Sequence, residues 1–326
     1  MPFYRCMNPS GSSGGDSYCD HITINYNGYE SPYTVDVYNN IPTLLNNALG
    51  DSSVFNSDVI IGSGVVNTNE LFSRCSMFNA NVDMSNANRL ATVPWMFFGC
   101  FNLNRPIVFP TNNIYSYYAT FRACLNYDQP TELFINTGNN TSLFVNLSSV
   151  FMQCSNFNSQ VKLNFLTNTF RFCQYDYMFY NADSYNQPTI LKYLGSFNGV
   201  FLNAAKMSAP IVVDLERLAT NAAIGNNALY VSNITEIIVL NYVNQAIKWD
   251  GGRPNITYYV NDPNTFVNRC TYLYRSGGAQ FNYLPCDNGL IANVSYYNIR
   301  VLYNVDDACN RFNNLYYERF GEYPEY

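Results

Sequence analysis

The feature that most constrains this chain is a motif repeated between about residues 49 and 207. In each copy a small residue has an aromatic residue or Leu three positions before it and a large apolar residue three positions after it. The small residue is Cys in four copies, Ala in two and Ser52 in a weaker first copy, and the copies are 22 to 30 residues apart. We predict that the motif side chains form the core: Phe72, Cys75, Phe78, Phe97, Cys100, Leu103, Phe121, Cys124, Tyr127, Phe151, Cys154, Phe157, Phe179, Ala182, Tyr185, Phe201, Ala204 and Met207.

A small polar residue follows each copy, and an alternating apolar stretch comes next. The i, i+3, i+6 spacing of the motif fits one face of a short helical turn, and a following Pro such as Pro106 ends it. Alternation, as in 59–61, 82–84, 107–109, 161–163 and 211–213, indicates a short strand with one buried face. We expect the polar residues to bridge the bend and form a ladder: Asn56, Asn79, Asn104, Asp128, Asn158, Asn186 and Ser208.

Self-similarity at this period predicts a solenoid, because one unit cannot bury its own apolar face. About five large apolar side chains contribute roughly 2 kcal/mol each. Ordering about two dozen residues costs at least about 24 kcal/mol of backbone entropy, so an isolated unit does not fold. The predicted fold class is an α+β repeat solenoid, a parallel β-solenoid with short helical turns.

Two stretches carry a family resemblance. MFFGCFNLNRPIVFP (96–110) resembles the BspA-like leucine-rich repeat, and MFYNADSYNQP (178–188) is similar to the related Met-Phe, Phe-Asn-Gln surface-protein repeats. Residues 255–270 resemble the terminal unit of such proteins, a strand followed by a short helix, and 234–241 fit a strand before it. The 30 residues between Cys124 and Cys154 depart from regular spacing. The resemblance implies a leucine-rich-repeat-type solenoid and a bacterial surface adhesin.

The predicted organisation has three parts. Residues 1–43 form an N-terminal cap or attachment segment, 44–270 a solenoid of about seven to nine units, and 271–326 an aromatic-rich cap or docking segment. Solenoids need capped ends, because an open terminal coil exposes apolar core. The aromatic tail also suggests a homo-oligomer.

Composition excludes several classes of partner. The net charge is −6 with only four lysines, so no nucleic acid is expected to bind. No apolar run is long enough for a membrane span, and the N-terminus has no secretory h-region. Without an extracellular context, the ten cysteines are expected to be reduced.

The sequence offers little catalytic chemistry, and we expect no enzyme activity, catalytic residue, cofactor or metal. The only histidine, His21, lies near Cys6 and Cys19, which gives three ligands in no common zinc spacing. Carboxylate pairs such as Asp214 with Glu216 fit solvated loops better than glycosidase chemistry.

With catalytic and metal chemistry set aside, the remaining functional hypothesis is binding through the protein surface. A low-charge face rich in Tyr and Asn suits protein or glycan contact. The candidate contact residues are Tyr115, Tyr117 and Tyr118. The leading hypothesis is a virion protein, a bacteriophage head, tail or fibre component that contacts other virion proteins and a host surface protein or glycan. The alternatives are a bacterial cell-surface adhesin and, more weakly, a glycan-degrading tail spike.

Overall fold

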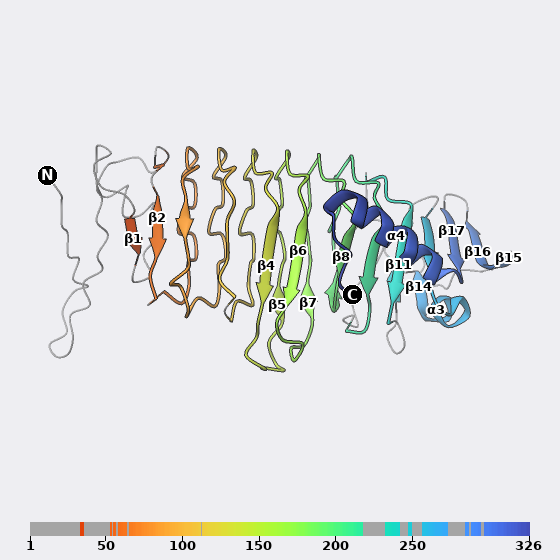
Figure 1. Ribbon diagram of the computed structural model, residues 1–326. Helices are drawn as coiled ribbons and strands as arrows, with labels where there is room; N and C mark the ends of the chain where they lie inside the picture. The colour runs from red at the N-terminus through yellow and green to blue at the C-terminus, as the bar shows by residue number, and fades with distance from the viewer. Residues whose placement is uncertain are drawn as a thin grey trace, which may run out of the picture.

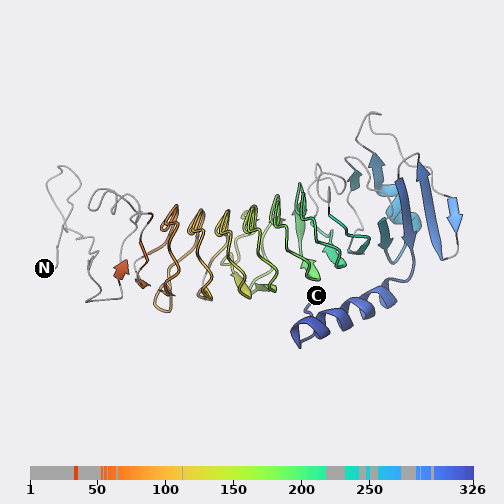
Figure 2. The ribbon, with the colours of Figure 1, turned by 90° about the horizontal axis from the view of Figure 1, so that it is seen from above.

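The computed structural model describes residues 33–35, 53, 55, 56, 58–63, 65–111, 113–217, 232–241, 247–249, 256–272, 284–286, 288–294 and 297–326. Figure 1 shows an elongated molecule in which successive coils of the chain lie side by side. Viewed from above, the coils form one row, with a helix along one side (Figure 2). The prediction of a parallel β-solenoid with non-repeat ends is confirmed.

One face of the solenoid is built from parallel strands contributed by successive coils. β10 pairs with β8 on one side and β11 on the other, and β4 pairs with β6, all in parallel. The strands of this face are β1 (Tyr33–Val35), β2 (Val59–Ile61), β3 (Val82–Asp83), β4 (Thr131–Ile135), β6 (Val161–Phe165), β8 (Thr189–Leu191), β10 (Ile211–Asp214), β11 (Glu236–Leu240), β13 (Ile256–Tyr259) and β17 (Tyr297–Leu302).

A second, narrower ladder lies elsewhere on each coil. It comprises β5 (Val145–Asn146), β7 (Cys173–Gln174) and β9 (Leu194–Ser196), and single parallel bridges continue it toward Asn67. A separate parallel pair joins β12 (Ile247–Trp249) to β14 (Cys270–Tyr272). Each coil is therefore tied to its neighbours at several points.

The motif segments are tandem β-turns, which corrects the expectation of helical turns. In each of six coils two residues four positions apart have positive φ, for example Trp95 (55°) and Gly99 (72°). Left-handed residues interrupt a right-handed helix. Backbone amides along the segment alternate between two kinds of hydrogen bond. The Cys100 N–H closes a turn by donating to Phe97 O of the same coil, while the Phe97 N–H donates to Thr120 O of the next coil. The alternating amide bonds make the segment a ladder of turns.

The apolar motif residues form the interior, and all eighteen of the residues predicted for the core are buried. The rings of Phe97 and Phe121 lie parallel with centroids 5.5 Å apart, and Phe121 and Phe151 repeat this at 5.6 Å. Equivalent stacking joins Phe72 to Phe97, Phe151 to Phe179 and Phe179 to Phe201. One column of rings therefore runs through six coils.

The small central residues form a second column beside the rings. The Cys100 thiol donates to Phe72 O of the preceding coil. In the same way the Cys124 thiol donates to Phe97 O, and the Cys154 thiol donates to Phe121 O. Burial raises the pKa of the Cys75 thiol to about 12, and burial also raises the pKa of Cys124. These cysteines are free thiols that pack and donate to carbonyl groups.

The predicted polar ladder is present. The side-chain oxygen of Asn79 accepts the Asn104 amide at 2.8 Å, and the Asn104 side chain accepts the Asp128 amide at 2.9 Å. The same bond links Asn56 to Asn79, Asp128 to Asn158, Asn158 to Asn186 and Asn186 to Ser208. The ladder needs a side-chain carbonyl or carboxylate oxygen at every rung, which explains why Asn and Asp recur.

Two details differ from the sequence expectations. Residues 107–109 alternate in burial, with Val108 71% exposed, but form no strand. Pro106 and Pro110 flank them and provide no N–H donor to a ladder. The long spacing between Cys124 and Cys154 reflects the longer strand β4 and the β4–β5 loop, which extends below the other coils with the β6–β7 loop in Figure 1.

The C-terminal part continues the sheet and then covers it. β13 and the helix α3 (Pro263–Arg269) form the expected strand-and-helix unit, and β17 pairs in parallel with β13. β17 pairs antiparallel with β16 (Gly289–Val294), which pairs with β15 (Leu284–Cys286). The sheet thus extends past both expected limits of the solenoid, residues 44 and 270. Apart from β1, the predicted N-terminal segment lies outside the described residues, as do Cys6, Cys19, His21 and Ser52.

The last element, α4 (Val305–Phe320), lies across the outward face of the sheet (Figures 1 and 2). Its buried residues Val305, Ala308, Phe312 and Tyr316 lie on one helix face. They pack against outward-pointing side chains of β10, β11 and β13: Val212, Ile238 and Tyr259. Strands beneath the helix are therefore apolar on both faces, as IVVD in β10 shows, whereas VKLNF in β6 alternates.

Candidate binding surface

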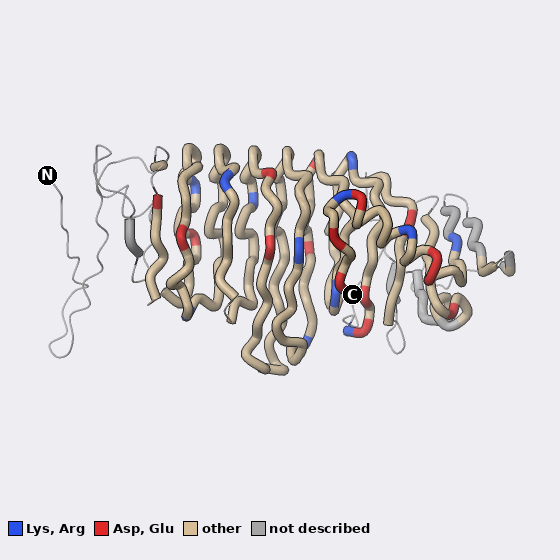
Figure 3. The backbone as a smooth tube through the Cα atoms, viewed as in Figure 1, with Lys and Arg blue, Asp and Glu red and all other residues tan. Residues whose placement is uncertain are grey.

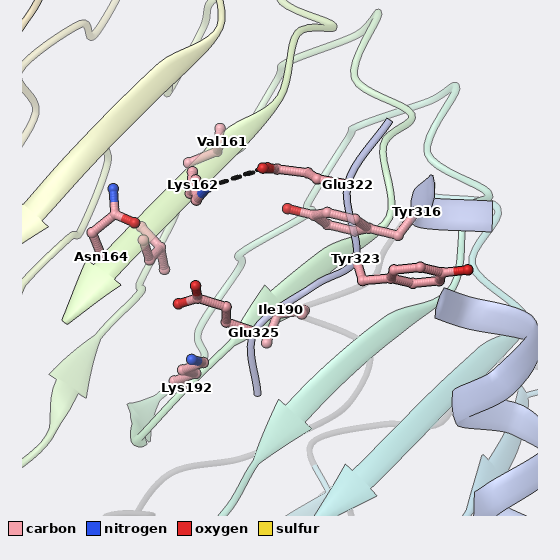
Figure 4. A pocket seen from close by; sticks show the side chains of 10 residues that line it. Val161, Lys162, Asn164, Ile190, Lys192, Tyr316, Glu322, Tyr323 and Glu325 are labelled. Atoms are coloured by element: carbon pink, nitrogen blue, oxygen red, sulfur yellow. Dashed lines mark hydrogen bonds and ion pairs between the residues drawn. The ribbon is translucent and has the colours of Figure 1, made fainter. Parts of the chain in front are cut away.

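A small cavity lies where the C-terminal end meets the sheet. Lys162, Lys192, Tyr316, Glu322 and Tyr323 are among the residues that line it (Figure 4). Its volume is about 40 Å³. A water molecule needs about 10–15 Å³ on this measure, so the cavity has room for a few waters.

The cavity belongs to the contact that holds the C-terminal end in place. Glu322 accepts from Lys162 at 3.1 Å and from Gln160 at 3.0 Å, and Gln160 also donates to the Tyr316 hydroxyl. Bonds to Gln160 and Lys162 lower the pKa of Glu322, while the bond to Glu322 raises the pKa of Lys162. Burial lowers the pKa of Lys192. Because the ion pair is partly exposed, it contributes about 0–1 kcal/mol.

A different surface is formed by the turn segments of three neighbouring coils. We call it the aromatic–arginine cluster. Trp95 meets Phe98 edge to face with centroids 5.1 Å apart, and it meets Tyr118 of the next coil in the same way at 5.3 Å. The guanidinium carbon of Arg122 lies 5.1 Å from the Trp95 ring centroid. The cluster consists of Arg74, Trp95, Phe98, Tyr118 and Arg122.

Both arginines of the cluster lie over aromatic rings. Arg122 lies 5.7 Å from the Phe98 centroid as well, and Arg74 lies 6.0 Å from the same ring. The Arg122 Nε is shielded from solvent and has no hydrogen-bond partner in the described chain. Cation–π contacts with Trp95 and Phe98 therefore hold the guanidinium in place, at about 0.5–2 kcal/mol for each contact.

The turn ladder explains why these side chains meet. Trp95 lies two residues before the core Phe97, and Phe98 lies one after it. Arg122 holds the position of Phe98 in the next coil, where Phe121 is the core residue. Because equivalent positions lie on one another, side chains 48 residues apart reach the same ring, as Arg74 and Arg122 both reach Phe98. The four residues other than Arg74 are half-buried, and Arg74 is exposed.

The positive φ of Trp95 is a property of the repeat. Glu70, Ala119, Ser149 and Tyr177 hold the same position with similar φ, and Gly199 does so without strain. A bulky aromatic residue with positive φ costs on the order of 1–3 kcal/mol. The sequence therefore places an indole where Gly is the easiest choice.

The three predicted contact residues have different positions. Tyr118 belongs to the cluster, and Tyr115 is half-buried. Tyr117 is a correction: its side chain is completely buried, and its hydroxyl donates to Phe134 O at 2.8 Å. Tyr117 lies four residues before Phe121, and the equivalent Tyr175 makes a similar inward bond to Lys192 O. Sequence reasoning missed the other four cluster residues.

The carboxylate pairs have structural contacts. The Asp214 carboxylate accepts a hydrogen bond from the Glu216 amide at 2.9 Å. Asp306 and Asp307 lie in the first turn of α4, where their negative charges interact favourably with the helix dipole. Over the described ranges, no group of three or more His, Cys, Asp and Glu side chains is placed to hold a metal ion. Within the same ranges, no helix has the length and hydrophobicity required to cross a bilayer.

Comparison with known proteins gives one family. The family described as "Mycoplasma protein of unknown function, DUF285" matches residues 43–139 and 111–212, which together cover 43–212, more than half of the 326 residues. No curated protein matches the chain. No solved structure matches it either. The family match is compatible with the BspA-like resemblance, and it contains nothing that indicates a bacteriophage.

Proposed function

The chain belongs to the DUF285 family of Mycoplasma proteins of unknown function, and we propose that it is a non-enzymatic, adhesin-like surface protein that binds a host protein. The contact surface in this proposal is the aromatic–arginine cluster. The solenoid supports it by holding residues from three coils in fixed positions.

The observation that carries the proposal is the chemistry of the cluster. Trp, Tyr and Arg are the residue types most enriched among the few residues that dominate protein–protein binding energy. Trp95, Tyr118 and Arg122 combine all three types, and each makes contact with at least one other cluster member. Figure 3 shows that the coils carry few charged residues. The aromatic rings of the cluster lose little by desolvation when a partner covers them.

A surface location, as in BspA-like adhesins, follows from this proposal and from the repeat family. The virion placement stays a prediction, since neither the described chain nor the family match favours it over a cell surface.

The test is adhesion of coated beads to cultured animal cells. Beads carrying the purified chain are expected to adhere, and Trp95→Ala is expected to reduce bead adhesion at least tenfold. Tyr177→Ala is the matched control, because Tyr177 holds the same repeat position with a φ of 59° and is 44% exposed. Equal adhesion of the two variants would remove the cluster from the binding surface.

A further inference from the structure

The cluster contains two guanidinium groups that lie over aromatic rings and form no ion pair with a carboxylate of the described residues. Among the described residues two ion pairs lie within 4 Å, Lys162 with Glu322 and Arg311 with Glu236. Neither pair includes Arg74 or Arg122. A guanidinium that lies over aromatic rings can still donate from its terminal N–H groups to a planar, bidentate acceptor.

The position of Arg122 limits the hydrogen bonds that its guanidinium can form within the chain. The guanidinium carbon of Arg122 lies 5.1 Å and 5.7 Å from two ring centroids of the preceding coil, those of Trp95 and Phe98, while its Nε is shielded from solvent. No described residue bonds to the terminal nitrogens of its guanidinium. Holding the group in place before binding removes much of the entropy cost of ordering it.

Charge at the cluster also favours an anionic ligand. Two guanidinium groups lie on Phe98, one from each neighbouring coil. Glu70, the equivalent of Trp95 in the preceding coil, is the carboxylate whose repeat position lies beside the cluster. The local balance is therefore one positive charge, in a chain whose total is −6.

We propose that the aromatic–arginine cluster binds a carboxylate side chain, Asp or Glu, of an acidic segment in the partner protein. This inference rests on the proposed function and names the chemistry of the partner. Arg122 donates from the terminal N–H groups of its guanidinium to the carboxylate oxygens, Arg74 adds positive charge, and Trp95 and Tyr118 pack against apolar parts of the same segment.

Poly-L-glutamate is the probe, titrated into the full chain at low salt while fluorescence and heat are recorded. The wild-type chain is expected to bind, with affinity that falls as salt rises. Arg122→Gln is expected to weaken binding at least tenfold. Arg171→Gln is the matched control, because Arg171 stacks on Phe172 at 5.3 Å, outside the cluster, and it is expected to bind within twofold of wild type. Arg122→Lys, which keeps the charge but loses the planar group, is expected to lie between them.

Three outcomes would overturn the inference: no binding of poly-L-glutamate by the wild-type chain, equal affinities for Arg122→Gln and Arg171→Gln, or binding of hyaluronan, a carboxylate glycan, at Arg122 in preference to poly-L-glutamate. The proposed function fails separately. If Trp95→Ala abolishes bead adhesion but poly-L-glutamate does not bind, the surface stands and its acidic ligand is wrong.

Discussion

Asn186 illustrates how single side chains fix the distance between coils. Its Oδ1 accepts three bonds from the next coil: Ser208 N–H at 2.9 Å, Ser208 O–H at 3.2 Å and Ala209 N–H at 2.9 Å. We expect Asn186→Ala to lower the free energy of unfolding by about 1–3 kcal/mol, because the amide of the buried Ala209 loses its acceptor. Urea denaturation measures the change.

The control for this prediction is Asn186→Asp. Asp keeps the acceptor oxygen, and Asp128 already serves as a rung of the same ladder. We expect Asn186→Asp to cost less than half as much as Asn186→Ala. Similar costs for both substitutions would mean that the ladder bond contributes nothing.

At the residue scale, the sequence analysis predicted the side chains that recur in every repeat and missed those that occur in only one repeat. The Asn ladder, the Cys column and the Phe column recur in register, so each copy supports the others. Trp95 and Arg122 occur once each at their repeat positions, and a single sequence gives no register signal for such residues. A usable signal existed in Trp95, one of two tryptophans, placed two residues before a core Phe.

At the scale of elements, the turn segments show a limit of periodicity. The i, i+3, i+6 spacing suits a helical turn, and it equally suits tandem β-turns closed by amides such as Cys100 N–H to Phe97 O. What distinguishes them is the positive φ at two positions per coil. Only Gly99 and Gly199 among those positions are glycines, so the sequence carried little sign of it.

The packing of helix α4 on the outward face of the sheet was not predicted from the sequence. Phe312 is buried in its apolar face against the outward side of the sheet, whereas Asn314 is exposed. We expect Phe312→Asp to detach the helix, since burying an unpaired carboxylate costs more than the packing returns. Loss of Phe burial alone costs about 3–5 kcal/mol. The measurement is binding of the dye ANS, which should rise as Val212 and Ile238 become exposed.

Asn314→Asp adds the same charge on the solvent side of α4 and should leave dye binding unchanged. An equal rise for both variants, or none for Phe312→Asp, would show that α4 does not protect this face.

At the scale of the whole molecule, the solenoid is a stack of parallel strands whose terminal strand leaves backbone N–H and C=O groups unpaired. At its C-terminal end the strand direction reverses in β16, and the last strand, β15, contains Pro285, which has no amide hydrogen to donate. A short edge strand of three residues and an edge proline both discourage pairing with another chain. Along its length, the same stacking that buries the phenylalanines brings Trp95 onto Arg122, so the fold and the candidate binding surface depend on one geometry.

The most direct test of that geometry is a double-mutant cycle between Phe121 and Phe151, which are 30 residues apart in sequence and stack with ring centroids 5.6 Å apart. Unfolding free energies of the wild type, Phe121→Leu, Phe151→Leu and the double variant give the coupling. Stacked coils predict a coupling of about 0.5–1.5 kcal/mol beyond additivity. Costs that add to within about 0.3 kcal/mol would contradict the account, because residues without contact behave independently.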